Sequence, residues 1–155
     1  MAESAREGGD ISAVTVRDLI HTSVVTVTPD TTMASAAAGM VRARSGSAVV
    51  VQESFLAGIL TKWDVLQATA SGEDPSRAPV SAWMTPDPRS VSPDTPAEEA
   101  TQIMVQHGFH HLPVVEGKQV RGVIRLRDLL AARIRRPAPP TAPTDPADVP
   151  AGGAG

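Results

Sequence analysis

The stretch SAVVVQESFLAGILTKWDVL at residues 47–66 returns 64 positions later as HLPVVEGKQVRGVIRLRDLL at residues 111–130. Each stretch has two short apolar runs rich in β-branched residues, a polar turn between them and a helix start signal after them. We therefore predict a strand, a tight turn, a second strand and a helix in each stretch. The expected elements are strands at 48–51 and 56–60 with a helix at about 62–70, and strands at 112–115 and 120–124 with a helix at about 126–135.

The same offset of 64 residues extends upstream without a gap, which indicates an internal duplication. Matched pairs include Val16 with Val80, Pro29-Asp30-Thr31 with Pro93-Asp94-Thr95, Ala36 with Ala100, and Met40-Val41 with Met104-Val105. We assign the first copy to 14–70 and the second to 78–136, with a linker at 71–77 between them.

Each copy also has an apolar opening turn, a brief β-rich run (24–27 and 89–91) and an earlier helix. In the second copy, Thr95 is predicted as the N-cap, Pro96 as the first helical residue and Glu98 as the partner in a capping box. Both helices have apolar residues at helical spacing. These residues are Met33, Ala36, Ala37, Met40 and Val41 in the first copy, and Ala97, Ala100, Ile103, Met104 and His107 in the second.

One copy of about 55 residues is too small to bury both a sheet and its helices well. We therefore predict an α+β fold in which two βαββα repeats pack sheet to sheet with pseudo-twofold symmetry, leaving two related clefts between them. The polar residues 1–13 are expected to be flexible. Residues 137–155 are expected to be disordered, because they are rich in Pro, Ala and Gly and have almost no large apolar side chain.

The composition argues against several classes of protein. The 155 residues have a net charge of −3, so no basic surface indicates a nucleic-acid partner. Cysteine is absent, which excludes disulfides and thiolate chemistry. No apolar run approaches the length of a membrane span. We expect a cytoplasmic protein with neither a nucleic-acid partner nor a membrane partner.

The segment Gly58-Ile59-Leu60-Thr61-Lys62-Trp63-Asp64 ends a strand and opens a helix. In a structural interpretation, Thr61 caps the helix and Asp64 reaches back to it. In a functional interpretation, the helix N-terminus favours a phosphate, which Thr61 hydrogen-bonds, while the Asp64 carboxylate accepts both hydroxyls of a ribose. The two interpretations are compatible because a ligand can share a cap. Lys62 either reaches a phosphate or is solvated.

This motif, the segment His110-His111-Leu112-Pro113-Val114-Val115, the opening Met84-Thr85-Pro86 and the ungapped repeat resemble a pair of cystathionine-β-synthase (CBS) domains, a Bateman module. The resemblance covers about 14–136. It implies an adenosine-containing ligand such as AMP, ADP, ATP, NAD or S-adenosylmethionine. It also implies a homodimer and an effector protein that the module regulates. We predict no catalytic cofactor.

The resemblance implies two ligand sites. In the first, Thr61 and Asp64 hold phosphate and ribose, and the adenine lies against the other copy. Its remaining residues would be Ile59, Leu60, Lys62, Pro88, Phe109, His110, His111 and Pro113.

In the second site Arg125 replaces the hydroxyl residue, and a guanidinium offers no acceptor to a helix N-terminus. Asp128 can still accept ribose hydroxyls. Arg125 either binds a phosphate through two hydrogen bonds or pairs with Asp128 and closes the cleft. The rest of this site would be Val123, Ile124, Val24, Ser45, Gly46, Ser47 and Ala48.

No other residues form a recognisable reactive centre. His107, His110 and His111 lie close in sequence but lack a fourth ligand, so we predict no metal. No Ser-His-Asp order, Walker loop or HExxH motif indicates an enzyme. Trp63 and Trp83 are expected to pack or to form an interface. The leading hypothesis is a stand-alone regulatory module whose adenosyl ligand shifts dimer or partner packing; the alternative is a ligand-independent dimerisation module.

Overall fold

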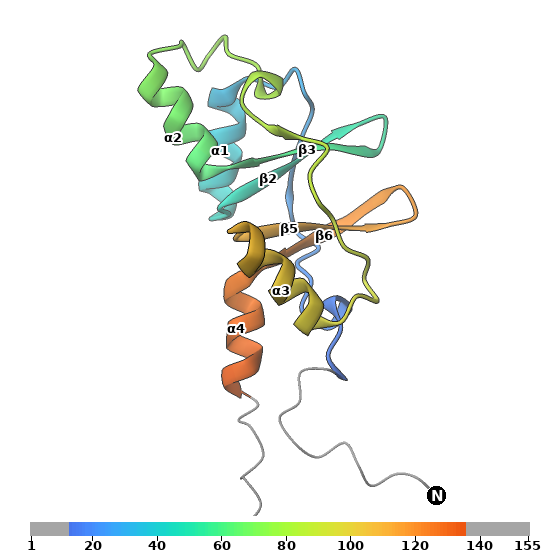
Figure 1. Cartoon of the computed structure of the whole chain (residues 1–155). Helices are drawn as coiled ribbons and strands as arrows, with labels where there is room; N and C mark the ends of the chain where they lie inside the picture. Colours follow the sequence, from blue (N-terminus) through green and yellow to red (C-terminus); the bar gives the residue numbers. More distant parts are fainter. Residues whose placement is uncertain (1–12, 136–155) are drawn as a thin grey trace, which may run out of the picture.

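The structure, a computed structural model, describes residues 13–135 (Figure 1). The predictions for 1–12 and 136–155 lie outside the described residues. The first repeat contains β1 (Val25–Val27), α1 (Met33–Ala43), β2 (Ser47–Gln52), β3 (Phe55–Thr61) and α2 (Lys62–Ser71). The second contains β4 (Thr85–Pro86), α3 (Ala97–His107), β5 (His111–Glu116), β6 (Gln119–Arg125) and α4 (Leu126–Arg135). Short 3-10 turns, η2 (Val16–Asp18) and η3 (Val80–Ala82), open the two copies.

The two strand hairpins confirm the duplication in detail. In the first repeat, Glu53 and Ser54 form a two-residue turn with positive φ angles of 51° and 71°, as the twist of tight hairpins requires. In each hairpin, the first strand residue pairs with the last one, Ser47 with Thr61 and His111 with Arg125. The register shift after Val50 recurs after Val114. The predicted strands are therefore each within one residue of the observed ones.

The strands form one sheet in the order β1-β2-β3-β6-β5, and β4 pairs with β3. The two halves join near the tips of their hairpins, where Phe55 pairs with Gln119. Alternate strand residues face the helices and form two separate cores. The other strand face is also buried, although its residues belong to neither helix-side core; they are Val49, Ile59, Pro113 and Val123. The two sheet halves thus cover one another, which confirms the predicted α+β architecture.

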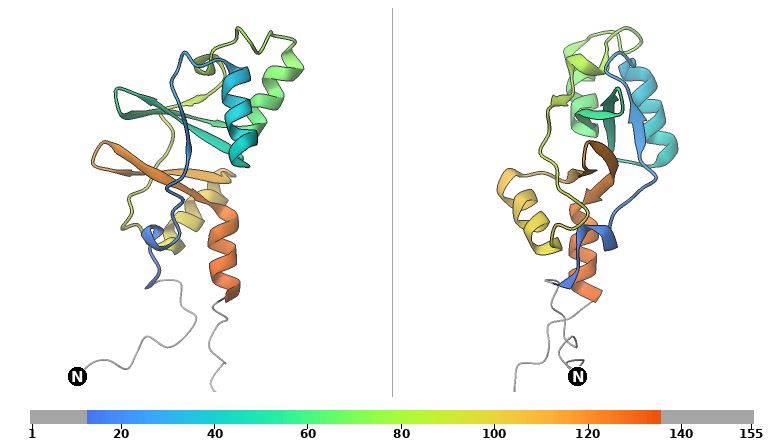
Figure 2. Two further views of the ribbon diagram at one scale, coloured as in Figure 1. Left: turned by 180° about the vertical axis from the view of Figure 1, so that it is seen from behind. Right: turned by 90° about the vertical axis from the view of Figure 1, so that its right-hand side faces the viewer.

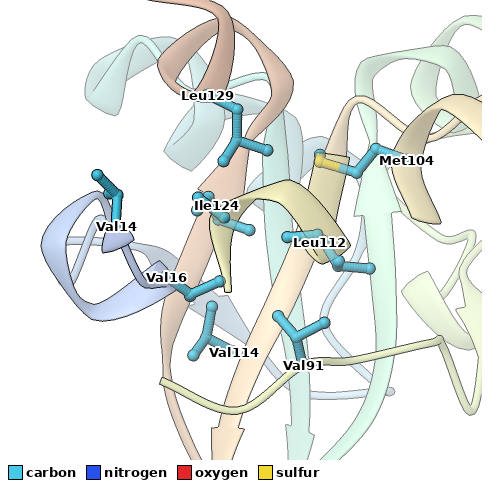
Figure 3. Close-up of a cluster of buried hydrophobic side chains, with 10 residues drawn as sticks. Val14, Val16, Val91, Met104, Leu112, Val114, Ile124 and Leu129 are labelled. Carbon is cyan, nitrogen blue, oxygen red and sulfur yellow. The ribbon is translucent and has the colours of Figure 1, made fainter. Parts of the chain in front are cut away.

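Each helix-side core contains the opening turn of the other copy. Val14 and Val16 pack in the second repeat (Figure 3), whereas Ala78 and Val80 pack in the first. Backbone hydrogen bonds fix both crossings: Val16 N–H donates to the Thr95 carbonyl at 2.9 Å, and Val80 N–H donates to the Thr31 carbonyl at 2.8 Å. Figure 2 shows the N-terminal segment running past the second repeat before it enters the first. Each predicted copy therefore begins with a turn that lies in the other repeat's core.

Three local predictions for the second copy are wrong. Thr95 is not an N-cap, because its hydroxyl accepts a hydrogen bond from the Ser92 N–H at 3.1 Å. Pro96 is the N-cap rather than the first helical residue, since α3 begins only at Ala97. The N–H of Ala97 instead donates to the Val14 carbonyl of the crossing turn, so the predicted capping box with Thr95 does not form. The run 89–91 is not a strand either. Only its last residue, Val91, bridges β5. Pro88, directly before the run, lacks the N–H that its counterpart Val24 has for strand pairing.

Candidate ligand-binding cleft

A cavity of about 420 Å³ lies between the two repeats. The first repeat contributes the end of β3 and the start of α2. The second copy contributes the segment after β4 and the loop and strand that follow α3. The residues lining the cavity are Gly46, Ile59, Thr61, Lys62, Trp63, Asp64, Thr85, Pro88, Arg89, Gly108, Phe109, His110, His111, Leu112 and Pro113.

The start of α2 supplies a hydroxyl and a carboxylate to this cavity. Asp64 Oδ2 accepts hydrogen bonds from the Thr61 N–H at 2.7 Å and from Thr61 Oγ1 at 3.1 Å. The carboxylate thus reaches back to the N-cap, as the structural interpretation of the motif predicts. The second oxygen, Asp64 Oδ1, makes no hydrogen bond within residues 13–135 and remains able to accept one from a ligand.

His111 forms part of the opposite wall and packs close to the first repeat. A Cβ atom at Gly46 would lie 3.0 Å from His111 Cε1, so glycine at that position lets the ring approach the backbone. Burial is the main cause that lowers the pKa of His111 to about 4, and the charges of His110, Lys62 and Arg125 lower it further. The ring is therefore neutral at pH 7 and offers one donor and one acceptor.

The lowered pKa of His111 leads to an expected pH dependence of stability. The unfolded ring binds a proton near pH 6.5 and the folded ring only near pH 4, so acid favours the unfolded chain across that window. The free energy of unfolding therefore falls between pH 7 and pH 5, and His111→Gln is expected to make this fall smaller by about 1 kcal/mol. The value allows for the partial exposure of the ring, which weakens the effect. Urea denaturation at the two pH values measures it. The exposed His107, changed to Gln, is the control; an unaltered pH dependence in His111→Gln would contradict the shift.

Aromatic side chains line the cavity from both repeats. Phe109 stacks on His107 with ring centroids 5.2 Å apart, and it is 36% exposed. Trp63 is 62% exposed at the start of α2. Trp63 was predicted to pack or to form an interface, and the structure places it in the cavity wall. Trp83 instead packs against the first core, and its Nε1–H donates to Glu73 at 2.8 Å.

The structure brings all but one of the residues predicted for the first site into this cavity. The exception is Leu60, which is fully buried in the first helix-side core. Because successive strand residues face opposite sides, the cavity wall receives Ile59 and the core receives Leu60. Six further lining residues were not predicted for the first site: Gly46, Trp63, Thr85, Arg89, Gly108 and Leu112. All but Gly46 lie within three residues of a predicted site residue, and this proximity was the available signal.

The predicted second site is occupied by ion pairs between its own side chains. Arg125 Nε and Nη2 donate to the two oxygens of Asp128 at 2.6 and 3.1 Å. His21 Nε2 lies 2.9 Å from Asp128 Oδ2. Burial raises the pKa of Asp128, but Arg125 and His21 outweigh it and hold the pKa below its ordinary value. Arg125 was predicted either to bind a phosphate or to pair with Asp128, and in the structure it pairs with Asp128.

The remaining residues predicted for the second site have several different surroundings. Ala48 and Ile124 face the two helix-side cores, and Gly46 lines the first cavity. Val123 is buried beside His21, with which it forms two backbone hydrogen bonds. The others lie at the first repeat's strand entrances, where Ser45 Oγ donates to the Ser47 carbonyl and Val24 is half-buried.

Two further observations concern metal ligands and membrane-spanning helices. Within residues 13–135, no three His, Cys, Asp or Glu side chains gather as metal ligands. No helix in the same range is long and apolar enough to cross a membrane.

The duplicated βαββα fold and its inter-repeat cavity define a paired-repeat module. A family model described as "CBS domain" matches residues 16–71 and 80–135, so the chain belongs to the CBS domain family. It is 37% identical over 115 residues to the CBS domain-containing protein YhcV of Bacillus subtilis (strain 168), covering 74% of this chain and 81% of that protein.

Two solved structures with the same fold contain adenosyl compounds. The structure of CBSX2 from Arabidopsis thaliana in complex with AMP has a TM-score of 0.67 and 24% identity, covering 78% of this chain and 96% of that one. The CBS domain pair of protein MJ0100, in complex with 5′-methylthioadenosine and S-adenosyl-L-methionine, has a TM-score of 0.69 and 22% identity, covering 76% and 93%. At these identities, the similarity shows the fold alone.

Proposed function

We propose that this chain is a regulatory CBS pair that binds an adenosyl ligand in the cavity between its repeats. The observation that carries the proposal is the joint origin of the cavity wall. Thr61 and Asp64 come from one repeat, and Phe109 and His111 come from the other. A volume of about 420 Å³ lies in the range of small-molecule sites. The AMP complex of CBSX2 supports the same class of ligand.

The wall offers a partner for each part of such a ligand. Ribose hydroxyls donate to the free Oδ1 of Asp64, and a phosphate lies at the start of α2 near Thr61 and Lys62. The base lies against the apolar and aromatic wall that includes Pro88, Phe109 and the neutral His111. A ligand in this position contacts both repeats at once.

Binding across the repeats would act on their relative packing and so on any surface they share. Four exposed apolar side chains offer such a surface on the helices. Val41 and Leu66 lie on α1 and α2 and are 76% and 55% exposed, and their counterparts Val105 and Leu130 lie on α3 and α4 at 67% and 47%. We assign this surface to a homodimer or to an effector protein, whose packing the ligand shifts.

A thermal-shift experiment with AMP, ADP, ATP, NAD, NADH and S-adenosylmethionine tests the proposal. At a ligand concentration of a hundred times Kd, binding stabilises the fold by about 2.7 kcal/mol, which raises Tm by several degrees. Asp64→Ala is expected to weaken binding about tenfold or more, because it removes a charged acceptor. No shift with any of the six compounds would sink the proposal.

Asp18→Ala is the matched control for Asp64→Ala. Asp18 makes the same reach-back contact, accepting from the Thr15 N–H at 3.0 Å, but it lies at η2 and outside the cavity wall. Both variants lose the contact, and only Asp64→Ala is expected to weaken ligand binding. An equal loss of binding in the two variants would assign the effect to stability instead.

The alternative function is a dimerisation module that ignores nucleotides. The Arg125–Asp128 pair in the second cleft favours it, because that pair satisfies the groups a ligand would otherwise meet. Sedimentation with and without ligand separates the two functions. A dimer whose association constant does not change with any of the six ligands supports the alternative.

A further inference from the structure

The cavity wall is positively charged in a chain that is negatively charged as a whole. The net charge of the chain is −3, yet the cavity has two permanent cations, Lys62 and Arg89, against a single carboxylate, Asp64. Lys62 comes from α2 of the first repeat, and Arg89 comes from the segment between β4 and α3. Neither cation forms an ion pair with any residue in 13–135, so both are available to a ligand.

One oxygen of the single carboxylate is engaged in local hydrogen bonds. Oδ2 of Asp64 already accepts two hydrogen bonds from Thr61. On the far side of His111, the carboxylate of Asp128 is paired with Arg125 and so adds little negative potential to the cavity. The wall therefore has more positive charge to offer a ligand than negative charge.

The buried ring of His111 lies near several positive charges, one of which is Lys62. After burial, the causes that lower the pKa of this ring are the positive charges of His110, Lys62 and Arg125, with Asp128 acting in the opposite sense. Positive charge from both repeats thus converges on this part of the wall. An anion at this position would face a cationic wall without having to displace an existing ion pair of Lys62 or Arg89.

We propose that this cleft selects adenosyl ligands that bear phosphate over the adenosyl sulfonium S-adenosylmethionine. The inference rests on the proposed function and specifies its ligand class. A phosphate monoester carries about two negative charges near pH 7, whereas the sulfonium compound carries a net positive charge. Lys62 and Arg89 attract the first and repel the second, and like-charge juxtaposition is a means of rejecting a wrong partner.

Calorimetric titration of the full chain with AMP, adenosine and S-adenosylmethionine tests the selection. Adenosine is the uncharged reference. AMP is expected to bind at least about tenfold more tightly than adenosine, with an affinity that falls as salt rises from 50 to 200 mM, because screening weakens exposed charges. S-adenosylmethionine is expected to bind more weakly than AMP by about tenfold or more.

Two variants assign the effect to the cations. Lys62→Gln and Arg89→Gln are each expected to weaken AMP binding about fivefold to tenfold and to leave adenosine binding unchanged. Both side chains are exposed, so the melting temperature of the free variants checks that they fold. Lys118→Gln is the matched control. Lys118 lies over the Phe55 ring at the hairpin tips, outside the cavity wall.

The outcomes separate this inference from the proposed function. Binding of S-adenosylmethionine as tight as that of AMP, or AMP binding unaffected by both cavity variants, overturns the selection and leaves an adenosyl site in place. Failure of all three compounds to bind overturns the selection, and the absence of a thermal shift with ADP, ATP, NAD and NADH as well overturns the site.

Discussion

Replacing Gly122 with alanine is expected to lower the free energy of unfolding by about 3 kcal/mol and Tm by roughly 10 °C. A Cβ at this position would collide with the carbonyl oxygen of His21 and would lie 2.8 Å from Ile20 Cγ1. The backbone cannot easily withdraw, because His21 exchanges two hydrogen bonds of 3.0 Å with Val123. The close crossing of the N-terminal segment over β6 therefore requires glycine at this position. A side chain there would push the two segments apart and weaken their contact.

Gly39→Ala is the control for this prediction. Gly39 lies inside α1, and a Cβ there would have Val25 Cγ1 at 3.4 Å as its nearest neighbour, an ordinary contact. Alanine in a helix interior is expected to stabilise the chain by about 0.5–1 kcal/mol relative to glycine. Urea denaturation of both variants measures the contrast. A stability of Gly122→Ala close to that of the unchanged chain would show that the crossing is absent in solution.

An equivalent crossing in the first repeat explains the other glycine of the repeat motif. Gly58 is the first-repeat counterpart of Gly122, and its Cβ would lie 2.9 Å from the backbone oxygen of Thr85 in β4. The sequence presents both glycines as members of a repeated motif near a helix start. Their physical role is the approach of a distant segment, which only the three-dimensional arrangement reveals.

Local features of the chain were predictable because they depend on neighbouring residues. The hairpins follow from two-residue turns between β-branched runs, and the Thr61–Asp64 contact follows from the spacing of a capping box. The burial of Leu60 was also within reach, since strand alternation places Ile59 and Leu60 on opposite faces.

Features that depend on distant residues were not predictable in this way. His21 joins the Arg125–Asp128 pair across a separation of 107 residues, and no local pattern marks it. Val16 and Val80 occupy equivalent positions in the repeat, so the sequence pattern fits packing against either core equally well. The N-cap prediction for Thr95 failed for the same reason. The N–H of Ala97, at the start of α3, donates to the Val14 carbonyl of the crossing turn rather than to a neighbouring side chain.

Val16→Ala is expected to destabilise the second repeat, although Val16 belongs to the first copy in sequence. The side chain is fully buried with Leu112, Val114 and Ile124, so its truncation costs about 2 kcal/mol. Hydrogen exchange is expected to accelerate in α3, β5 and β6. Val80→Ala is the symmetric test, with faster exchange expected in α1, β2 and β3 because Val80 packs in the first core.

The pair of variants distinguishes exchanged turns from independent repeats. If each turn packed in its own copy, Val16→Ala would accelerate exchange in α1 and β2, and Val80→Ala in α3 and β5. The exchanged arrangement has a functional consequence, since each core then holds a segment covalently joined to the other repeat. A ligand that fixes the spacing of the repeats also fixes both crossing turns, so it is expected to slow exchange in the two cores together. Protection confined to one core would show that the ligand acts on a single repeat.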